Sequence, residues 1–195
     1  MSEEDRAHWE RAYAKRPLEP ASAPAPFLVE NASLLAPGRT LDVASGSGRN
    51  SMFLASRGHR VVAADISGEA LRALRSQATA VDAVQVDLDR PCFARGGFDN
   101  VVCINFLDRR LFDEMLSWLA PGGVLLLDTF SIEQRTIGHP RNPAFLLGHG
   151  ELLERMRGQR VLRHREGVVE DESGKSFRAG IVVKLAKLTS PSAPA

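Results

Sequence analysis

The sequence has very few of the residues that mark secreted, metal-binding or membrane-spanning proteins. Its 195 residues include two cysteines, Cys92 and Cys103, which are too few for a disulfide framework and are not spaced like metal ligands. No apolar run approaches the length of a membrane span, and the acidic start MSEEDRAHWE does not resemble a signal peptide. We therefore predict a cytoplasmic protein without a metal site or a membrane partner, in which Cys103 is a buried thiol.

An excess of charge of one sign is also absent. The 25 lysines and arginines nearly balance the 24 aspartates and glutamates, which leaves a formal net charge of +1. This balance argues against a protein whose main role is to bind the backbone of a nucleic acid. The length and the hydrophobic content of 44% suit one globular domain.

The two ends of the chain differ from its middle. Residues 3–15 have a helical pattern that places Trp9 and Tyr13 on one face, and the proline-rich run RPLEPASAPAP follows. The aromatic face is either a lid over a binding site or part of the core. We divide the chain into an N-terminal helix and linker (1–26), one α/β domain (27–188) and a flexible tail (189–195).

Short apolar runs and helical runs alternate through the middle of the chain. Most of the apolar runs are continuous, as in strands that are buried on both faces of a parallel sheet, so the pattern predicts a doubly wound α/β fold. The strands are predicted at 40–44, 60–65, 82–86, 98–104 and 124–128, and the helices at 49–57, 68–78 and 109–119.

The last third of the chain has a different pattern. A long loop is predicted at 129–148 and a short helix at 151–156. Two strand-like runs then meet at the turn 172–175, and the second run alternates strictly. Its apolar face consists of Phe177, Ala179, Ile181, Val183 and Leu185. The mostly parallel sheet is therefore expected to end in an antiparallel hairpin.

A glycine turn and three carboxylates point to a ligand site. Gly46 and Gly48 lie between the first strand and the first helix, where glycine allows positive φ and close approach of a ligand. Asp65 ends the second strand, 65 − 48 = 17 residues after Gly48, near the usual offset of a ribose-binding acid. Asp87 ends the third strand, and Asp42 precedes the turn. Ligands of such sheets bind at this edge.

The charges favour one ligand over another. A dinucleotide would place its pyrophosphate at the turn, where Asp42 would repel it. Ser51 also occupies the position of the third glycine in the dinucleotide motif. S-adenosylmethionine has no phosphate and carries a net positive charge, which the acids would attract.

The order of these segments resembles the class I S-adenosylmethionine-dependent methyltransferases. The resemblance covers residues 40–130 and rests on LDVASGSGRN, VVAADIS, VQVDLD, FDNVVCINFL and LAPGGVLLLDTF. Within that class, GSGRNSMFLASRGHRV is similar to the tellurite-resistance and thiopurine-type group, and the segment of Trp9 and Tyr13 is similar to that group's N-terminal segment over the cofactor. The resemblance implies a Rossmann-like fold with S-adenosylmethionine as cofactor.

The resemblance also implies a role for individual residues. Ala44 stands where the motif usually has its first glycine, and Phe106 is expected near the reacting methyl. The predicted cofactor-binding residues are Asp42, Ala44, Gly46, Gly48, Arg49, Asn50, Asp65, Ile66, Asp87, Leu88, Ile104 and Asn105.

The methyl acceptor is less well defined. Methyl transfer needs alignment of the acceptor more than a strong base, and the short region before the hairpin favours a small acceptor, methylated on sulfur or oxygen. The candidates at the site mouth are Thr129, Phe130, His139 and Arg141, with His139 either a base or a solvated loop residue. Two alternatives stay open, a nicotinamide-dependent oxidoreductase and a non-catalytic module that binds S-adenosylmethionine.

Overall fold

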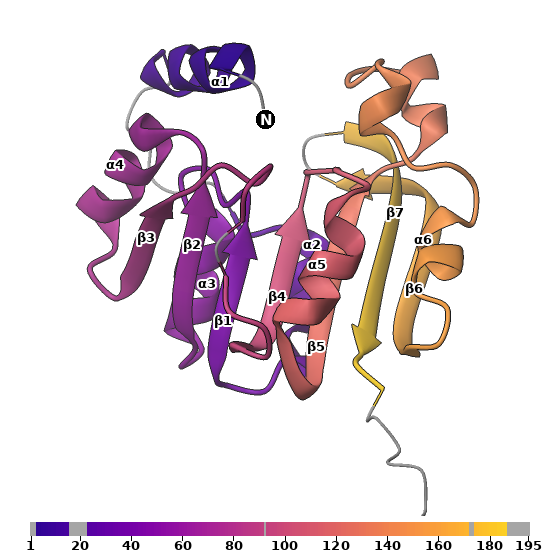
Figure 1. The fold of residues 1–195 in the computed structure, drawn as a ribbon. Helices are drawn as coiled ribbons and strands as arrows, with labels where there is room; N and C mark the ends of the chain where they lie inside the picture. Colours follow the sequence, from indigo (N-terminus) through magenta and orange to yellow (C-terminus); the bar gives the residue numbers. More distant parts are fainter. Residues whose placement is uncertain (1–2, 16–22, 92, 172–173, 187–195) are drawn as a thin grey trace, which may run out of the picture.

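The sheet order confirms the predicted fold. The computed structural model describes residues 3–15, 23–91, 93–171 and 174–186, so Cys92, most of the proline-rich run, the turn at 172–173 and the tail lie outside the described residues. Seven strands form one sheet in the order β3-β2-β1-β4-β5-β7-β6 (Figure 1). Strands β1 to β5 pair in parallel, and β7 pairs antiparallel with both β5 and β6. The last two strands are the predicted hairpin.

Most elements begin and end close to their predicted positions. The strands are β1 (Arg39–Val43), β2 (Arg60–Asp65), β3 (Val81–Gln85), β4 (Phe98–Ile104), β5 (Leu119–Phe130), β6 (Arg160–Asp171) and β7 (Gly174–Lys184). The helices are α1 (Glu3–Ala14), α2 (Pro26–Asn31), α3 (Arg49–Ser56), α4 (Gly68–Gln77), α5 (Leu111–Trp118) and α6 (Glu151–Arg155), with short 3-10 turns at Ala32–Leu34, Ile132–Thr136 and Pro143–Phe145.

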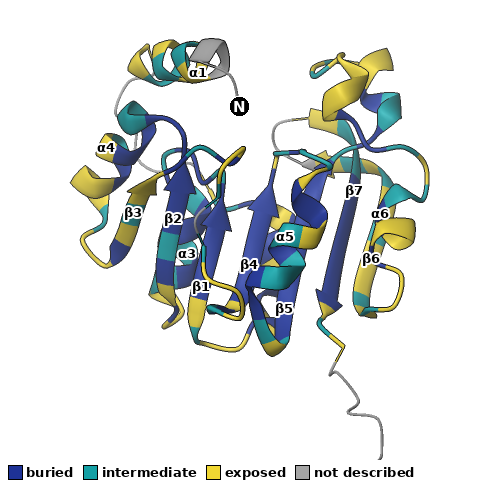
Figure 2. Cartoon of the chain, in the orientation of Figure 1, coloured by how far each residue is buried: buried dark blue, intermediate teal, exposed yellow. Residues whose placement is uncertain are grey.

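Helices cover both faces of the sheet and divide the core in two. On one face, side chains of α5 and α6 such as Phe112, Trp118 and Leu152 pack on the strands. On the other face, α2, α3 and α4 contribute side chains that include Leu28 and Leu74. The central strands are accordingly buried on both sides, whereas β3 and β6 at the edges are largely exposed (Figure 2). This burial is the physical reason for the continuous apolar runs.

Two predictions about the region around β5 were wrong. We expected the strand to begin at Val124 because Pro121-Gly122-Gly123 normally ends a structural element. Instead β5 begins at Leu119, and a shift in the β4–β5 register takes up these residues. The strand also continues to Phe130, so Thr129 is a buried strand residue paired with Ala179 and does not belong to a loop. The rest of the predicted loop contains the two 3-10 turns.

Other expectations concern burial and membranes. Cys103 is buried as predicted, and burial raises the pKa of its thiol well above the ordinary range. Within the described residues, no helix is both long and apolar enough to cross a membrane. The same part of the chain contains no cluster of His, Cys, Asp and Glu side chains that could hold a metal ion.

Candidate functional site

A cavity of about 350 Å³ opens at the carboxyl edge of the sheet. It lies where β1 and β4 are neighbours but their connections lead to opposite sides, which is the usual ligand position in such sheets. Trp9 and Tyr13 line it from α1, and Ser45 and Ser47 line it from the turn. Helix α1 lies beyond the carboxyl ends of the strands (Figure 1). The predicted site residues that line the cavity are Ala44, Gly46, Arg49, Asn50, Asp65, Ile66, Leu88, Ile104, Asn105 and Phe106.

The glycine turn has positive φ at Gly46 and Gly48, as the sequence predicts, and also at Ala44, where the sequence did not indicate it. Ala44, Gly46 and Gly48 all have positive φ, at 54°, 56° and 83°. Gly48 does not line the cavity, however. A Cβ atom there would overlap the side chain of Leu74, which is fully buried. Gly48 therefore lets the turn pack against α4, whereas at Gly46 an added Cβ would meet the hydroxyl of Tyr13 on the cavity side.

Asp65 joins the turn to the second strand. It is only 7% exposed, and its two oxygens accept hydrogen bonds from the backbone N–H groups of Gly46 (2.8 Å) and Ser67 (2.9 Å). Burial raises the pKa of Asp65, while these hydrogen bonds oppose the rise. Because a carboxylate has about four acceptor positions, Asp65 can still accept from a ligand's hydroxyl groups.

Asp42 lies beneath the turn and not in the cavity wall. It is 1% exposed and accepts a hydrogen bond of 2.5 Å from the Ser51 hydroxyl. Burial raises the pKa of Asp42 from 3.8 to about 7, so the group carries little fixed charge below neutral pH. The expectation that Asp42 repels a pyrophosphate therefore loses most of its force. Ser51, at the third glycine position, serves as the partner of this acid.

The raised pKa of Asp42 predicts how the free energy of unfolding depends on pH. Because the pKa of Asp42 is higher in the folded protein than in the unfolded chain, ionisation of this carboxyl group opposes folding. The stability that the protonated group provides is therefore lost as the pH rises from near 3.8 to about 7. The Asp42→Asn variant has no such ionisation. We expect the free energy of unfolding of the wild type, minus that of the variant, to fall across this range in urea titrations. Asp65 titrates in both proteins, so its slope largely cancels. A difference that does not change with pH would contradict the assignment.

Two further predicted residues lie away from the cavity wall. Asp87 accepts a hydrogen bond from the Asp89 backbone N–H (3.0 Å), and its neighbour Leu88 lines the cavity instead. His139 is exposed, and its carbonyl accepts a hydrogen bond from the Gln134 amide (3.0 Å). Neither side chain is brought to the cavity. The other mouth candidates, Thr129, Phe130 and Arg141, do not line it either.

The sequence did not reveal that α1 is attached to α4. The Glu10 carboxylate accepts hydrogen bonds from the backbone N–H groups of Gly68 (2.8 Å) and Glu69 (3.0 Å), at the start of α4. Ser67, the N-cap of α4, also donates from its hydroxyl to Glu10 while accepting from the backbone N–H of Ala70. A carboxylate is favourable at a helix N-terminus, but nothing in the sequence specifies which helix it will reach. These bonds hold α1 across the cavity.

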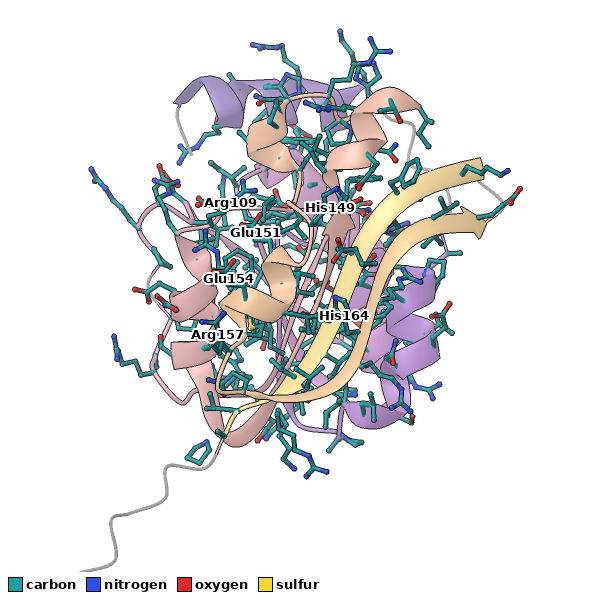
Figure 3. The ribbon with its side chains drawn as sticks, turned by 90° about the vertical axis from the view of Figure 1, so that its right-hand side faces the viewer. Arg109, His149, Glu151, Glu154, Arg157 and His164 are labelled. Atoms are coloured by element: carbon teal, nitrogen blue, oxygen red, sulfur yellow. The ribbon has the colours of Figure 1, made fainter. Side chains whose placement is uncertain are left out.

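The wall after β4 is held by a second cluster. Arg109 donates from two nitrogens to the two oxygens of Glu151 (2.7 and 2.8 Å) and also to the carbonyls of Ala144 and Leu146. Figure 3 shows Arg109 and Glu151 side by side. This bidentate ion pair holds the segment before α6 against the residues that precede α5. On the opposite side, Asn50 accepts from the backbone N–H of Ala25 (3.0 Å) and so anchors the chain entering α2.

Comparison with known proteins identifies the central segment. A family profile described as a methyltransferase domain matches residues 40–123. The match runs from β1 into β5 and covers less than half of the chain. The matched segment contains the glycine turn, Asp65 and β4. A comparison with curated proteins finds no match.

Solved structures of other proteins share the fold of this chain. TehB from Haemophilus influenzae superposes with a TM-score of 0.70 at 21% identity over 90% of this chain, which spans only 66% of TehB. A methyltransferase from Methanosarcina mazei gives 0.67 at 21% over 85% and 100% of the two chains. A protein whose structure is described for conversion of a disulfide bond into a thioacetal group in echinomycin biosynthesis gives 0.73 at 19% over 96% and 95%. The fold is that of class I S-adenosylmethionine-dependent methyltransferases.

One buried atom of the glycine turn is available to a ligand. Ser45 is 8% exposed and lines the cavity, and its hydroxyl has no hydrogen-bond partner within the described residues. Buried hydroxyl groups normally have partners. A bound molecule with polar groups at the turn would supply one.

Proposed function

We propose that the cavity binds S-adenosylmethionine and that the protein transfers its methyl group to a small molecule. One observation carries the proposal: a buried carboxylate, Asp65, lines the same cavity as Arg49, beside a turn of positive-φ residues. A carboxylate suits ribose hydroxyls. A guanidinium suits the carboxylate of an amino acid.

The sheet order supports a layout for the cofactor. Leu88, Ile66, the turn and Ile104 follow or end β3, β2, β1 and β4, which are neighbours in that order. Three strand spacings span about 14 Å, enough for an extended nucleoside joined to an amino acid. We place the adenine between Ile66 and Leu88, the ribose at Asp65, and the methionine part between the β1 turn and the end of β4.

The bound cofactor supplies a methyl group already activated by a sulfonium. The protein then has to align an acceptor with that methyl and keep water away. Phe106 lies on the cavity wall beside Asn105, and Trp9 and Tyr13 line the cavity from α1. Apart from Asp65 and Arg49, only Tyr13 among the lining residues carries a titratable side chain. We therefore propose an acceptor that needs no strong base, such as a small thiol or an acidic hydroxyl compound.

Methyl transfer is tested by acceptor-dependent formation of S-adenosylhomocysteine. The purified protein is incubated with S-adenosylmethionine and separate panels of small thiols, small hydroxyl compounds, peptides and RNA. We expect product only with small molecules. Product that forms only with peptides or RNA would contradict the proposed acceptor class. Tight binding of the cofactor without turnover on any panel would instead favour a non-catalytic binding module.

Because α1 places Trp9 on the cavity wall, we predict that the fluorescence of Trp9 reports ligand binding. Trp9 is 39% exposed on the cavity wall, whereas the other tryptophan, Trp118, is 1% exposed in the core. If α1 closes over the cofactor, S-adenosylhomocysteine should change the fluorescence of Trp9. The Trp9→Phe variant keeps only Trp118 and should show little change. An equal change in both proteins, or none in either, would refute the lid.

A further inference from the structure

Asp128, near the carboxyl end of β5, is surrounded by residues of the neighbouring strands β4, β7 and β6. The Asp128 side chain is 2% exposed. Arg178 donates to it from Nε (2.9 Å) and from Nη2 (2.6 Å), and Arg165 donates to its other oxygen (3.2 Å). Two guanidinium groups thus pair with one buried carboxylate, which fixes the orientation of each. Gly180 makes room, because a Cβ there would lie 2.8 Å from the Asp128 oxygen.

Only one of the two arginines reaches the cavity wall. Arg178 Nη2 also donates to the side-chain oxygen of Asn105 (2.6 Å), and the Arg178 guanidinium lies over the ring of Phe130, 4.5 Å from its centre. Arg165 contacts Phe27 and Glu30 on the opposite side of the carboxylate. The two residues therefore share Asp128 but differ in their relation to the site.

Asn105 has a conformation that needs such support. Its φ is 59°, a left-handed value that is uncommon outside glycine. Its backbone N–H donates to the carbonyl of Asp128 (2.9 Å), and its side chain accepts from Arg178. Both contacts come from outside the cavity, and they hold Asn105 at the end of β4, on the cavity wall.

We propose that Arg178 is a positioning residue for the amino-acid end of the cofactor site, acting through Asn105. The inference rests on the proposed function, which places the methionine part between the β1 turn and the end of β4. Asp128 orients Arg178, and Arg178 holds Asn105 in its left-handed conformation. The backbone after Ile104 then faces the ligand. Loss of Arg178 lets Asn105 relax toward negative φ. The contacts to the methionine part then weaken, and those to adenine and ribose remain.

Two ligands separate this role from general destabilisation. S-adenosylhomocysteine contains the amino-acid part, and 5′-methylthioadenosine lacks it. For Arg178→Gln we expect the dissociation constant of S-adenosylhomocysteine, measured by calorimetry, to rise about tenfold, the lower end for loss of a charged hydrogen bond. That of 5′-methylthioadenosine should change less than about twofold. The matched control is Arg165→Gln, which also removes one guanidinium from Asp128 but does not touch Asn105.

Asn105→Ala removes the same contact without disturbing Asp128, so it serves as a second variant if Arg178→Gln does not fold. It should reproduce the selective loss, and the double variant should lose no more than either single one. Equal weakening of both ligands, no weakening, or the same selectivity in Arg165→Gln would overturn the positioning role. If the wild-type protein binds neither ligand, the proposed function fails, and the inference fails with it.

Discussion

Replacing Asp65 with alanine is expected to weaken S-adenosylhomocysteine binding by two orders of magnitude or more. The carboxylate is buried and accepts from the backbone N–H groups of Gly46 and Ser67. The substitution removes the proposed ribose contact, which carries the expected loss of binding. It also leaves two buried donors without a partner, which lowers the stability of the folded protein by about 1–3 kcal/mol each. Because one of these donors belongs to the turn, the cavity wall is expected to lose its shape as well.

The matched control is Asp82→Ala, which removes an exposed carboxylate from β3 far from these contacts. Calorimetric titration of both variants with S-adenosylhomocysteine, and urea unfolding of both, separates the two effects. We expect Asp82→Ala to bind like the wild type. An Asp65→Ala protein that binds within about threefold of the wild type would remove Asp65 from the site.

The Gly48→Ala variant is expected to show a large loss of stability. A non-glycine residue at φ 83° costs about 1–2 kcal/mol, and the new Cβ would overlap buried Leu74, which adds about 1–3 kcal/mol. For a domain of this size, each kcal/mol lowers the melting temperature by about 2–4 °C. The melting temperature should therefore fall by about 5–15 °C.

Gly58 provides the control for this experiment. It also has a positive φ, 86°, but an added Cβ would meet nothing within 4 Å. Gly58→Ala should therefore show only the backbone part of the loss, and the difference between the two variants measures the packing of the turn against α4. Equal losses in Gly48→Ala and Gly58→Ala would show that Leu74 does not constrain the turn.

The fold could be predicted because its local and global signals agree. Apolar runs such as Arg60–Asp65 and Phe98–Ile104 match β2 and β4 at both ends, since strands buried on both faces must be apolar throughout. The start of β5 could not be predicted. A Cβ at Gly123 would lie 2.9 Å from the carbonyl oxygens of Asp99 and Ala120, so the lack of a side chain lets the chain run this close to β4 after Pro121. That fit depends on a neighbouring strand.

The site could be predicted only where the topology alone places a residue. The ends of parallel strands meet at one edge, so Asp65, Ile66 and Ile104 were expected together and do line one cavity. Sequence position does not show that Asp42 lies below the turn. Nor does it show that Glu10 reaches α4 or that Arg178 reaches Asn105, 58 and 73 residues away. Those contacts arise from packing between distant segments.

Calorimetric titration of the wild-type protein with S-adenosylhomocysteine, and in parallel with NAD and NADP, tests the central claim most directly. Asp65, Arg49 and a positive-φ turn line one cavity of about 350 Å³. We predict micromolar binding of S-adenosylhomocysteine and no measurable binding of either nicotinamide cofactor. Binding of NAD or NADP, or of none of the three, would contradict the proposed cofactor and leave only the fold established.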